Sequence, residues 1–496
     1  MKKKTAMLLM TLLCIAAACA QALEVTGLET DVVIREWETN AFFARMEELT
    51  GIPVHAHGVA EEDEYEKMIA GLAAGERAQA DVLFKASLTR NQEYALLDSG
   101  AVIDLAPLID AHMPNLSALL AANPHWKRTI ALEDGRIASL PLINEKERQA
   151  FMWINRKWLD QLGMDMPETL EELTAALAAM KDQDLNGNGK DDERAADLLG
   201  VYEMRWLLPY VGVVADDYNL ARDAQGEIVF APELPAYRAF IELLRDWYEQ
   251  GILGRRAFMD MHGAEALSNA NNEEKPVVSG MIFTVTPYTH VPVEAIEDYE
   301  PVLIPGPDGS IRWRDLLGPI WTGCFAVTSA CENPAEALAW VDTLYGEAGA
   351  LLAYAGVEGE DYTLDADGLW AFKLTDGRTV NDIRSETLIY TGEATPGLYP
   401  SDFVQRVDSA VDQHVFAANE RVRAVSERVT MPYVLSRAEQ ARADELAGVL
   451  GNLVDRGIAR FATGEVELND NTYAAWLSEL RAAGSEELTA LFAAAE

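Results

Sequence analysis

The chain has 496 residues, enough for a large hydrophobic core and too many for one ordinary domain, so we expect two lobes or domains. Hydrophobic residues make up 49% of the chain and aromatic residues 8%, which is typical of a folded protein and not of a disordered one. The formal net charge of −41 repels nucleic acid and anionic lipid, which argues against a nucleic-acid-binding role.

Residues 1–22 have the pattern of an export signal. Lysines at positions 2–4 precede an apolar run and a stretch of small residues. Removal of this segment deletes three lysines and no acidic residue, which takes the net charge from −41 to −44. Two cleavage sites stay open: A-Q-A ending at Ala22 fits a signal peptidase site, and A-A-A-C ending at Cys19 resembles a lipobox. We therefore expect an extracellular or cell-surface protein, secreted or lipid-anchored through Cys19.

Strand and helix patterns alternate along the first part of the chain beyond the signal. Three buried strands are predicted at residues 31–37, 52–57 and 80–84. Between them lie two amphipathic helices, which end at Gly51 and Gly75. The order β-α-β-α-β predicts an α/β fold with a parallel, doubly wound sheet.

Several later helices have clear start signals. Thr169 and Ser436 each open a capping box, and the second helix is predicted to reach about Phe461. Asn333 precedes a proline that starts another helix. Apolar residues at helical spacing predict further helices at 237–250 and 473–495. The segments near 140–145 and 302–315 are candidate crossings between two lobes.

Ligands of doubly wound sheets bind beyond the carboxyl ends of the strands. This rule makes residues after the first and third predicted strands candidate ligand contacts, namely Glu36, Trp37, Glu38, Lys85 and Ser87.

Eleven tryptophans form an unusual excess, and several of them lie where strands end or loops begin. Aromatic rings that line a cleft stack on sugars or hold peptide side chains. For each single ring a core position is an equal alternative, but as a group they favour a ligand cleft. The candidate aromatic contacts are Trp37, Trp153, Trp206, Tyr288, Trp313 and Trp321.

Motifs for catalysis are missing from the sequence. There is no H-E-x-x-H, G-x-S-x-G, phosphate-binding loop or G-x-G-x-x-G. His55 and His57 share one strand face, but no third metal ligand is evident. Cys324 and Cys331 are too far apart along a predicted strand for a disulfide, so we expect two free thiols.

Residues 184–193 carry the most specific short signal. Asp184, Asn186 and Asn188 alternate with small residues, and Asp192 and Glu193 follow. These side chains, with the backbone carbonyl of Lys190, supply the oxygen ligands that Ca²⁺ prefers. The twelfth position of an EF-hand loop would be Ala195, which cannot bind the ion. We therefore expect a structural Ca²⁺ site and not a calcium switch, with a plain tight turn as the alternative.

In order along the chain, these pieces resemble the extracellular solute-binding proteins of ABC importers, family 1, which include oligosaccharide-binding members. The resemblance rests on "FFARMEELTGIPVHA", "ADVLF", "MWINRKWLDQLGMDMPETLEELTAALAAMKDQDLNGNGKDDE" and "GCFAVTSACENPAEALAWVDTLY". In relatives the third stretch carries a hinge strand, a capped helix and a calcium loop. Departures are Ala80 in place of a proline, Leu185 in place of a proline in the loop, and the weak lipobox.

The resemblance implies a two-lobed, periplasmic-binding-protein-like (type II) fold with a hinge and an interlobe ligand cleft. The expected division is a signal peptide (1–22), lobe I (23–145), lobe II with the calcium loop (146–300), a return to lobe I (301–355), and the rest of lobe II with the C-terminal helices (356–496).

The implied function is that of a monomeric, non-enzymatic receptor that delivers an oligosaccharide to ABC permease subunits. The alternatives are a receptor for a peptide or another polar solute, a secreted polysaccharide hydrolase or lyase, and a purely structural calcium-stabilised surface protein.

Overall fold

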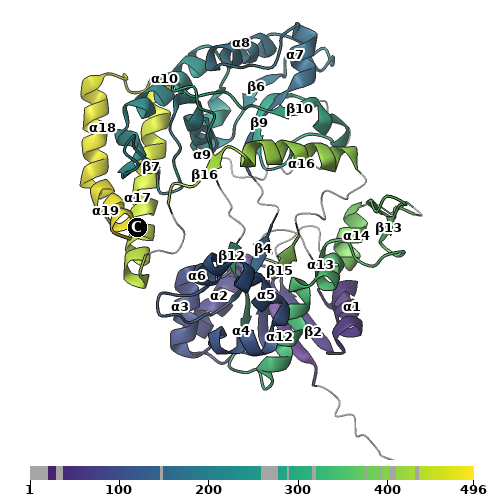
Figure 1. Ribbon diagram of the computed structural model, residues 1–496. Coiled ribbons are helices and arrows are strands. Elements are labelled where there is room, and N and C mark those ends of the chain that lie inside the picture. The colour runs from purple at the N-terminus through teal and green to yellow at the C-terminus, as the bar shows by residue number, and fades with distance from the viewer. Residues whose placement is uncertain are drawn as a thin grey trace, which may run out of the picture.

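The computed structural model describes residues 21–29, 37–145, 149–258, 277–287, 290–315, 320–375, 377–378, 380–389, 394–400, 409–430 and 435–495. They form two lobes, each built around its own β-sheet (Figure 1). In this part of the chain no helix has both the length and the apolar character to cross a membrane. The predicted export signal lies outside the described residues, except for Gln21 and Ala22.

The sheet of the first lobe has the strand order β15-β4-β12-β3-β1-β2 among the described residues. β12 runs antiparallel to its neighbours β3 and β4, and the other pairs are parallel. The strands are β1 (Leu23–Leu28), β2 (Val54–Val59), β3 (Val82–Phe84), β4 (Leu140–Asn144), β12 (Ile320–Val327) and β15 (Gly397–Tyr399).

Helices cover this sheet, and local capping explains several of their ends. The Asn40 side chain accepts a hydrogen bond from the Phe42 amide at the start of α1, and Gly51 ends that helix with φ 73°. The helical elements of the lobe are α1 (Ala41–Thr50), α2 (Glu62–Ala73), α3 (Arg90–Ser99), α4 (Ala106–His112), α5 (Pro114–Ala122), α6 (Pro124–Ile130), α12 (Pro334–Asp342), α13 (Glu347–Tyr354), α14 (Val380–Thr387) and the 3-10 helices η1 (Trp37–Thr39) and η7 (Thr343–Tyr345). The hairpin β13 (Tyr362–Leu364) and β14 (Trp370–Phe372) projects from it.

The sheet of the second lobe has the order β10-β5-β9-β6, made of β5 (Phe151–Asn155), β6 (Arg194–Asp197), β9 (Ser279–Thr284) and β10 (Tyr299–Pro301). β6 pairs with β9 in parallel, and the other pairs are antiparallel. Its α-helices are α7 (Arg156–Leu162), α8 (Leu170–Lys181), α9 (Gly200–Met204), α10 (Pro235–Glu249), α16 (Ala410–Arg423), α17 (Arg437–Ala462), α18 (Asp470–Ala482) and α19 (Ser485–Ala495).

Short elements complete the second lobe. The 3-10 helices are η2 (Arg205–Val211), η3 (Ala231–Glu233), η4 (Arg255–Phe258) and η6 (Val293–Asp298). The small pairs are β7 (Leu220–Arg222) with β8 (Ile228–Phe230), and β11 (Trp313–Arg314) with β16 (Ser426–Glu427).

The hydrophobic core is divided between the two lobes, and the described residues change from one lobe to the other three times along the chain. One core draws on residues 150–313 and 415–492, whereas the core around the first sheet draws on residues 23–143 and 324–399. The first crossing follows β4. From the sequence we expected the chain to return to the first lobe after residue 300 and to the second lobe after residue 355. However, Val302 and Trp313 still pack in the second core, and Tyr362 and Tyr399 still pack in the first.

The first strand differs from the prediction. β1 begins at Leu23, directly after the predicted signal, and pairs with β2 and β3. Of the expected strand 31–37, residues 31–36 lie outside the described part of the chain, and Trp37 lies in η1. The predicted second and third strands are present as β2 and β3, and the capping box at Ser436 opens α17 as expected.

Candidate ligand-binding site

In each lobe, the edge of the sheet at which the chain crosses over faces the other lobe. In the first lobe the carboxyl ends of β3, β4 and β15 and the start of β12 share one edge, because β12 is antiparallel. Figure 1 shows β4, β12 and β15 at the side of the lobe that faces the second lobe. In the second lobe the start of β5 pairs with the end of β9 at Phe151 and Thr284, next to the first crossing. Doubly wound sheets bind ligands at such edges.

The loop after β3 has a strained backbone at this edge. Lys85 has φ 51° and Ser87 has φ 50°, and among the described residues Asn219 is the other non-glycine with a positive φ. Such conformations cost of order 1–3 kcal/mol each and gather at functional sites. Ser87 is exposed, whereas Lys85 is 4% exposed. The structure thus places Ser87 on the surface that faces the second lobe.

Trp321, at the start of β12, lies at the same edge. Its ring is partly buried, and its indole Nε1 finds no hydrogen-bond partner among the described residues. A buried, unpaired N–H is costly, so a ligand or water that accepts from it would be favourable. Of the five predicted tryptophans, Trp321 is the one with this exposure.

The other four predicted tryptophans are core residues in this structure. Trp37, Trp153, Trp206 and Trp313 are each at most 1% exposed. Trp37 packs on Phe84 at 5.7 Å between ring centroids. The indole nitrogens of Trp153 and Trp313 donate to the carbonyls of Thr284 and Ala150, which satisfies them inside the second lobe.

The remaining predicted contacts do not join this group. The Glu38 carboxylate lies 2.8 Å from Nδ1 of His57, and Glu24 pairs in the same way with His55 at 2.9 Å, on the face of the edge strand β2. Each histidine therefore has a carboxylate partner. Glu36 and Tyr288 lie outside the described residues.

A cluster that the sequence reasoning missed lies on the second lobe. The Arg314 guanidinium lies 4.5 Å above the Trp206 ring, and its Nη2 pairs with Asp217 at 2.5 Å. Tyr202, on α9, meets Trp206 edge-on and is 41% exposed. Figure 1 shows α9 on the side of its lobe that faces the first lobe. The exposed aromatic ring here is thus Tyr202, because Arg314 covers Trp206.

Burial perturbs a carboxyl on the same helix. Burial raises the pKa of Glu203 to about 7, against the hydrogen bond that its Oε2 accepts from the Leu199 amide. Asp197 nearby raises the pKa further, because two negative charges in one environment are unfavourable. Glu203 therefore changes its charge near neutral pH.

The predicted calcium loop lies between α8 and β6, at the end of β6 farthest from the first lobe. Its oxygen-bearing side chains turn inward: Asp184 accepts from the Gly189 amide, and Asp192 accepts from the side-chain amides of Asn186 and Asn188. These amides lower the pKa of Asp192. Glu193 accepts from the backbone of residues 185 and 186 and closes the loop.

The carboxylates among the expected ligands of the loop are Asp184, Asp192 and Glu193. Within the described part of the chain, no group of three or more His, Cys, Asp or Glu side chains is arranged to hold a metal ion. Two of the expected ligands are asparagines, and a third is the Lys190 carbonyl.

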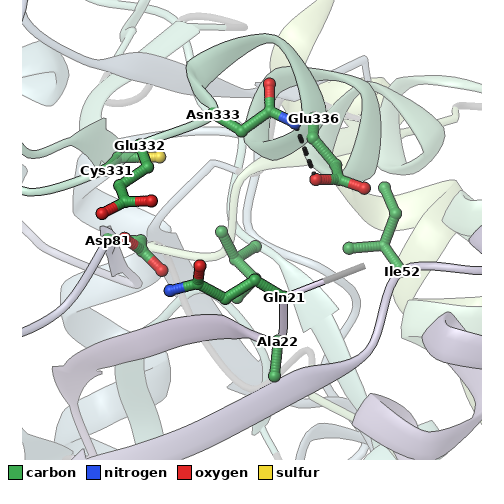
Figure 2. Close-up of a pocket in the computed structure, with 9 residues that line it drawn as sticks. Gln21, Ala22, Ile52, Asp81, Cys331, Glu332, Asn333 and Glu336 are labelled. Carbon is green, nitrogen blue, oxygen red and sulfur yellow. Dashed lines mark hydrogen bonds between the residues drawn. The ribbon is translucent and has the colours of Figure 1, made fainter. Parts of the chain in front are cut away.

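A small pocket of ≈ 40 Å³ lies in the first lobe, at the opposite edge of the sheet (Figure 2). It is lined by residues that precede β1, β2 and β3 and by the turn after β12, including Ala22, Ile52, Asp81 and Cys331. Since these are the amino ends of the parallel strands, the pocket is remote from the edge that faces the second lobe. Cys324 is buried and Cys331 partly buried, and both are free thiols as expected.

A larger groove of ≈ 670 Å³ lies between the lobes, beside the first turn of α17. Asn91 and Glu133 line it from the first lobe, and Ser436 and Arg437 from the second. Arg437 pairs with Asp98, and its guanidinium lies 5.0 Å from the centroid of the Tyr94 ring. This is a direct contact between the lobes besides the three crossings.

Comparisons with known proteins agree with this architecture. Over 274 residues the chain is 28% identical to FusA, the fructooligosaccharide ABC transporter substrate-binding protein of Streptococcus pneumoniae serotype 4 (strain ATCC BAA-334 / TIGR4). That match spans 53% of this chain and 50% of the relative, so it covers about half the length of each.

Solved structures show the same fold over nearly the whole chain. An EF-hand mutant of S. pneumoniae FusA in complex with fructo-nystose has a TM-score of 0.76 at 19% identity, over 95% of this chain and 98% of that one. An HMO-binding, ABC-transporter-associated solute-binding protein from Bifidobacterium longum infantis ATCC 15697 has a TM-score of 0.80 at 19% identity, over 96% and 98%. The expected α/β, two-lobed, periplasmic-binding-protein-like fold is confirmed.

The family model described as bacterial extracellular solute-binding protein matches residues 36–351, which is well over half of the chain. Members of that family bind solutes. The match ends in α13 and includes β2, β3, β4 and β12 of the first sheet and all four strands of the second, whereas β1 and β15 lie outside it. The chain therefore belongs to the bacterial extracellular solute-binding protein family.

Proposed function

We propose that this protein is an exported, non-enzymatic receptor that captures an oligosaccharide between its lobes and delivers it to the permease of an ABC transporter. The observation that carries the proposal is the strained, exposed loop at Ser87 beside the unpaired indole of Trp321, on the sheet edge where such folds bind ligands. Family membership and the names of FusA and the milk-oligosaccharide binder support a sugar ligand.

The proposed contacts come from both lobes. The first lobe contributes Lys85, Ser87 and Trp321, and the second contributes Tyr202 and Asp217. Partly buried aromatic rings flanked by a few polar groups suit the apolar face and the hydroxyls of a sugar. Glu36, Glu38 and Tyr288 stay proposed contacts from the sequence alone. The buried tryptophans 37, 153, 206 and 313 would support these surfaces from within the core.

A thermal-shift panel tests the function. It contains kestose, nystose, human milk oligosaccharides and short peptides, each at several concentrations. A bound ligand raises Tm as its concentration exceeds Kd and is recovered unchanged. A shift with peptides alone would favour the alternative of a peptide receptor. Product appearing in the mixture would instead establish a polysaccharide hydrolase or lyase and end the receptor proposal.

The calcium proposal rests on the donor set of the 184–193 loop. Asp184, Asp192 and Glu193 supply carboxylates, the two asparagines supply amide oxygens after a turn of their side chains, and Lys190 supplies its carbonyl. The FusA structure named as an EF-hand mutant supports a calcium site in a relative. When bound, the ion would hold α8 against β6; it would take no part in ligand chemistry, because the loop lies at the far end of β6.

The proposed export route uses the signal at residues 1–22, with cleavage after Ala22 or before Cys19. β1 begins at Leu23, so either cleavage leaves the first strand intact. Mass spectrometry of the protein from its native membrane and medium distinguishes the two: a diacylglyceryl group on Cys19 supports a lipid anchor, and an unmodified chain that starts at Leu23 supports secretion. We propose that the receptor acts as a monomer.

A further inference from the structure

A buried polar network lies beneath the candidate ligand edge of the first lobe. Glu93, on α3, is 0% exposed, and Ser139, just before β4, is 1% exposed. The Ser139 hydroxyl donates to the Glu93 carboxylate and accepts from the backbone N–H of Gly323 at 2.9 Å. Arg90 donates to the other carboxylate oxygen at 2.9 Å. Burial raises the pKa of Glu93, and the Arg90 charge opposes that shift.

One end of the network lies where two backbones touch, and at its other end Arg90 donates to the carbonyls of Thr129 and Ile130. Gly323 has φ 79°, and a Cβ atom there would lie 2.1 Å from the carbonyl oxygen of Leu88. The register of β12 against β4 shifts between Trp321 and Phe325, around this glycine. Its carbonyl accepts from the Leu88 amide at 3.0 Å. Gly323 therefore joins three parts of the chain: the Ser139 hydroxyl, the loop after β3 and the start of β12.

The strained loop is fixed by the same stretch of β12. The amides of Ala86 and Leu88 donate to the carbonyls of Cys324 and Gly323, both at 3.0 Å. The left-handed conformations at positions 85 and 87 alternate with these two anchored amides. Strained backbone persists where its surroundings over-determine it. The bulge at Gly323 supplies that restraint. The bulge is in turn fixed by the hydrogen bond from the Gly323 N–H to the Ser139 hydroxyl.

We propose that Glu93, acting through Ser139, is a positioning residue for ligand recognition: it fixes the bulge at Gly323 and thereby sets the places of Ser87 and Trp321. This inference rests on the proposed function, because those two residues are its proposed ligand contacts. Glu93 itself touches no ligand, since it is fully buried. Its effect passes through the hydroxyl of Ser139 and the Gly323 amide.

The network need not exist for stability alone. Removing one partner of a buried polar network leaves the others unpaired, whereas replacing the whole set with apolar groups is often neutral. The feature that bears on recognition is the end at Gly323: its N–H lies in the stretch between Trp321 and Phe325 where the register shifts, and its carbonyl accepts from the Leu88 amide of the strained loop.

The test compares Ser139→Ala and Glu93→Gln with Thr328→Val. Thr328 is also fully buried in the first sheet, and its hydroxyl donates to the Ala80 carbonyl at 2.6 Å. It lies at the opposite edge of the sheet, so it is a matched control for the loss of a buried hydroxyl. Hydrogen–deuterium exchange of the ligand-free proteins reports on the amides of Ala86, Leu88 and Gly323. Calorimetry with kestose and nystose reports on affinity.

We expect faster exchange at these three amides in Ser139→Ala and Glu93→Gln, and about tenfold weaker sugar binding, whereas Thr328→Val lowers Tm without either effect. Unchanged exchange in both variants overturns the proposal. So does faster exchange with wild-type affinity, because the network would then be structural only, and the receptor function would still stand. If the wild type binds neither these sugars nor any sugar of the panel, the receptor proposal fails, and the exchange data alone decide whether Glu93 positions the edge.

Discussion

Two neighbouring aromatic residues of the second lobe have opposite exposures. Tyr202 is 41% exposed, and Trp206, four residues later, is 1% exposed under the Arg314 guanidinium. A ring that touches ligand can be removed at little cost to folding, whereas a buried indole cannot. We predict that Tyr202→Ala weakens sugar binding about tenfold with little change in the free energy of unfolding, and that Trp206→Ala costs about 3–5 kcal/mol of stability. Calorimetry and urea unfolding measure the two effects.

Tyr202→Phe is the control for this pair, because it keeps the ring and removes the hydroxyl. It should retain most of the affinity if stacking dominates. Wild-type affinity in Tyr202→Ala would remove Tyr202 from the site.

Glu203 should make the second lobe less stable as the pH rises, which is the opposite of the usual effect of a carboxylate. Burial raises its pKa from 4.5 in the unfolded chain to about 7 in the folded protein. The contribution of Glu203 to the free energy of unfolding is therefore complete below pH 4.5. It falls by on the order of 3 kcal/mol as the pH rises through 7. We predict that Glu203→Gln raises Tm at pH 8 and leaves it nearly unchanged at pH 4.5. The neutral amide oxygen can still accept from Leu199.

Chemical unfolding of both proteins between pH 4.5 and 8 measures this difference. The curves should diverge as the pH increases. Parallel curves would mean that the Glu203 carboxylate stays hydrated when the protein is folded. The comparison uses the difference between variants, since other carboxylates titrate in the same range.

At the scale of elements, the 184–193 loop should act as a brace between α8 and β6. We predict that EDTA lowers Tm and that Asp184→Ala abolishes the difference between EDTA and Ca²⁺. Asp191→Ala is the matched control, because Asp191 is an exposed acid of the same loop that is not among the proposed ligands. To release a tightly held ion, the protein is unfolded and refolded in EDTA before measurement. Equal Tm values in EDTA and Ca²⁺ after that treatment would mean that the loop is a plain turn.

Elements with strong local signals could be predicted from the sequence. α17 follows from Ser436 and Glu439, whose side chains form the capping box that the spacing indicates. β1 could not be predicted in this way, because L-E-V-T-G-L adjoins the signal and is less apolar than the V-V-I run that follows it. β1 is defined by its pairing with β2 and β3. The residues that pair with Val25 lie 31 and 57 positions further along the chain.

The candidate site was predictable only in outline. The rule for strand ends pointed to Lys85 and Ser87, which follow β3, but it could not show which tryptophans are covered. Trp206 is covered by Arg314, more than a hundred residues away, and Trp37 by Phe84. The hydrogen bonds that link Glu93 to Ser139, and Ser139 to Gly323, leave no local pattern, because they join three distant segments.

At the scale of the whole molecule, α17 connects the two lobes. Its buried residues Leu446, Leu450 and Val454 fix it in the second core, while its first turn reaches the first lobe (Figure 1). There Arg437 pairs with Asp98, which also accepts from Arg136 at 3.1 Å. Two-lobed proteins close by hinge motion around their crossings. A contact across the lobes away from the crossings therefore restricts that motion in the ligand-free protein.

We predict that Arg437→Ala widens the range of lobe orientations, so that the ligand-free radius of gyration in X-ray scattering increases and its change on addition of ligand becomes larger. Arg442→Ala is the matched control, since Arg442 lies on the same helix and pairs with Glu487 and Glu445 inside the second lobe. In the wild type, 1 M salt should reproduce part of the Arg437→Ala effect, because it shortens the screening length to about 3 Å. The variant itself should respond little to salt. Identical scattering of Arg437→Ala, Arg442→Ala and wild type at low salt would show that the Arg437 side chain does not set the arrangement of the lobes.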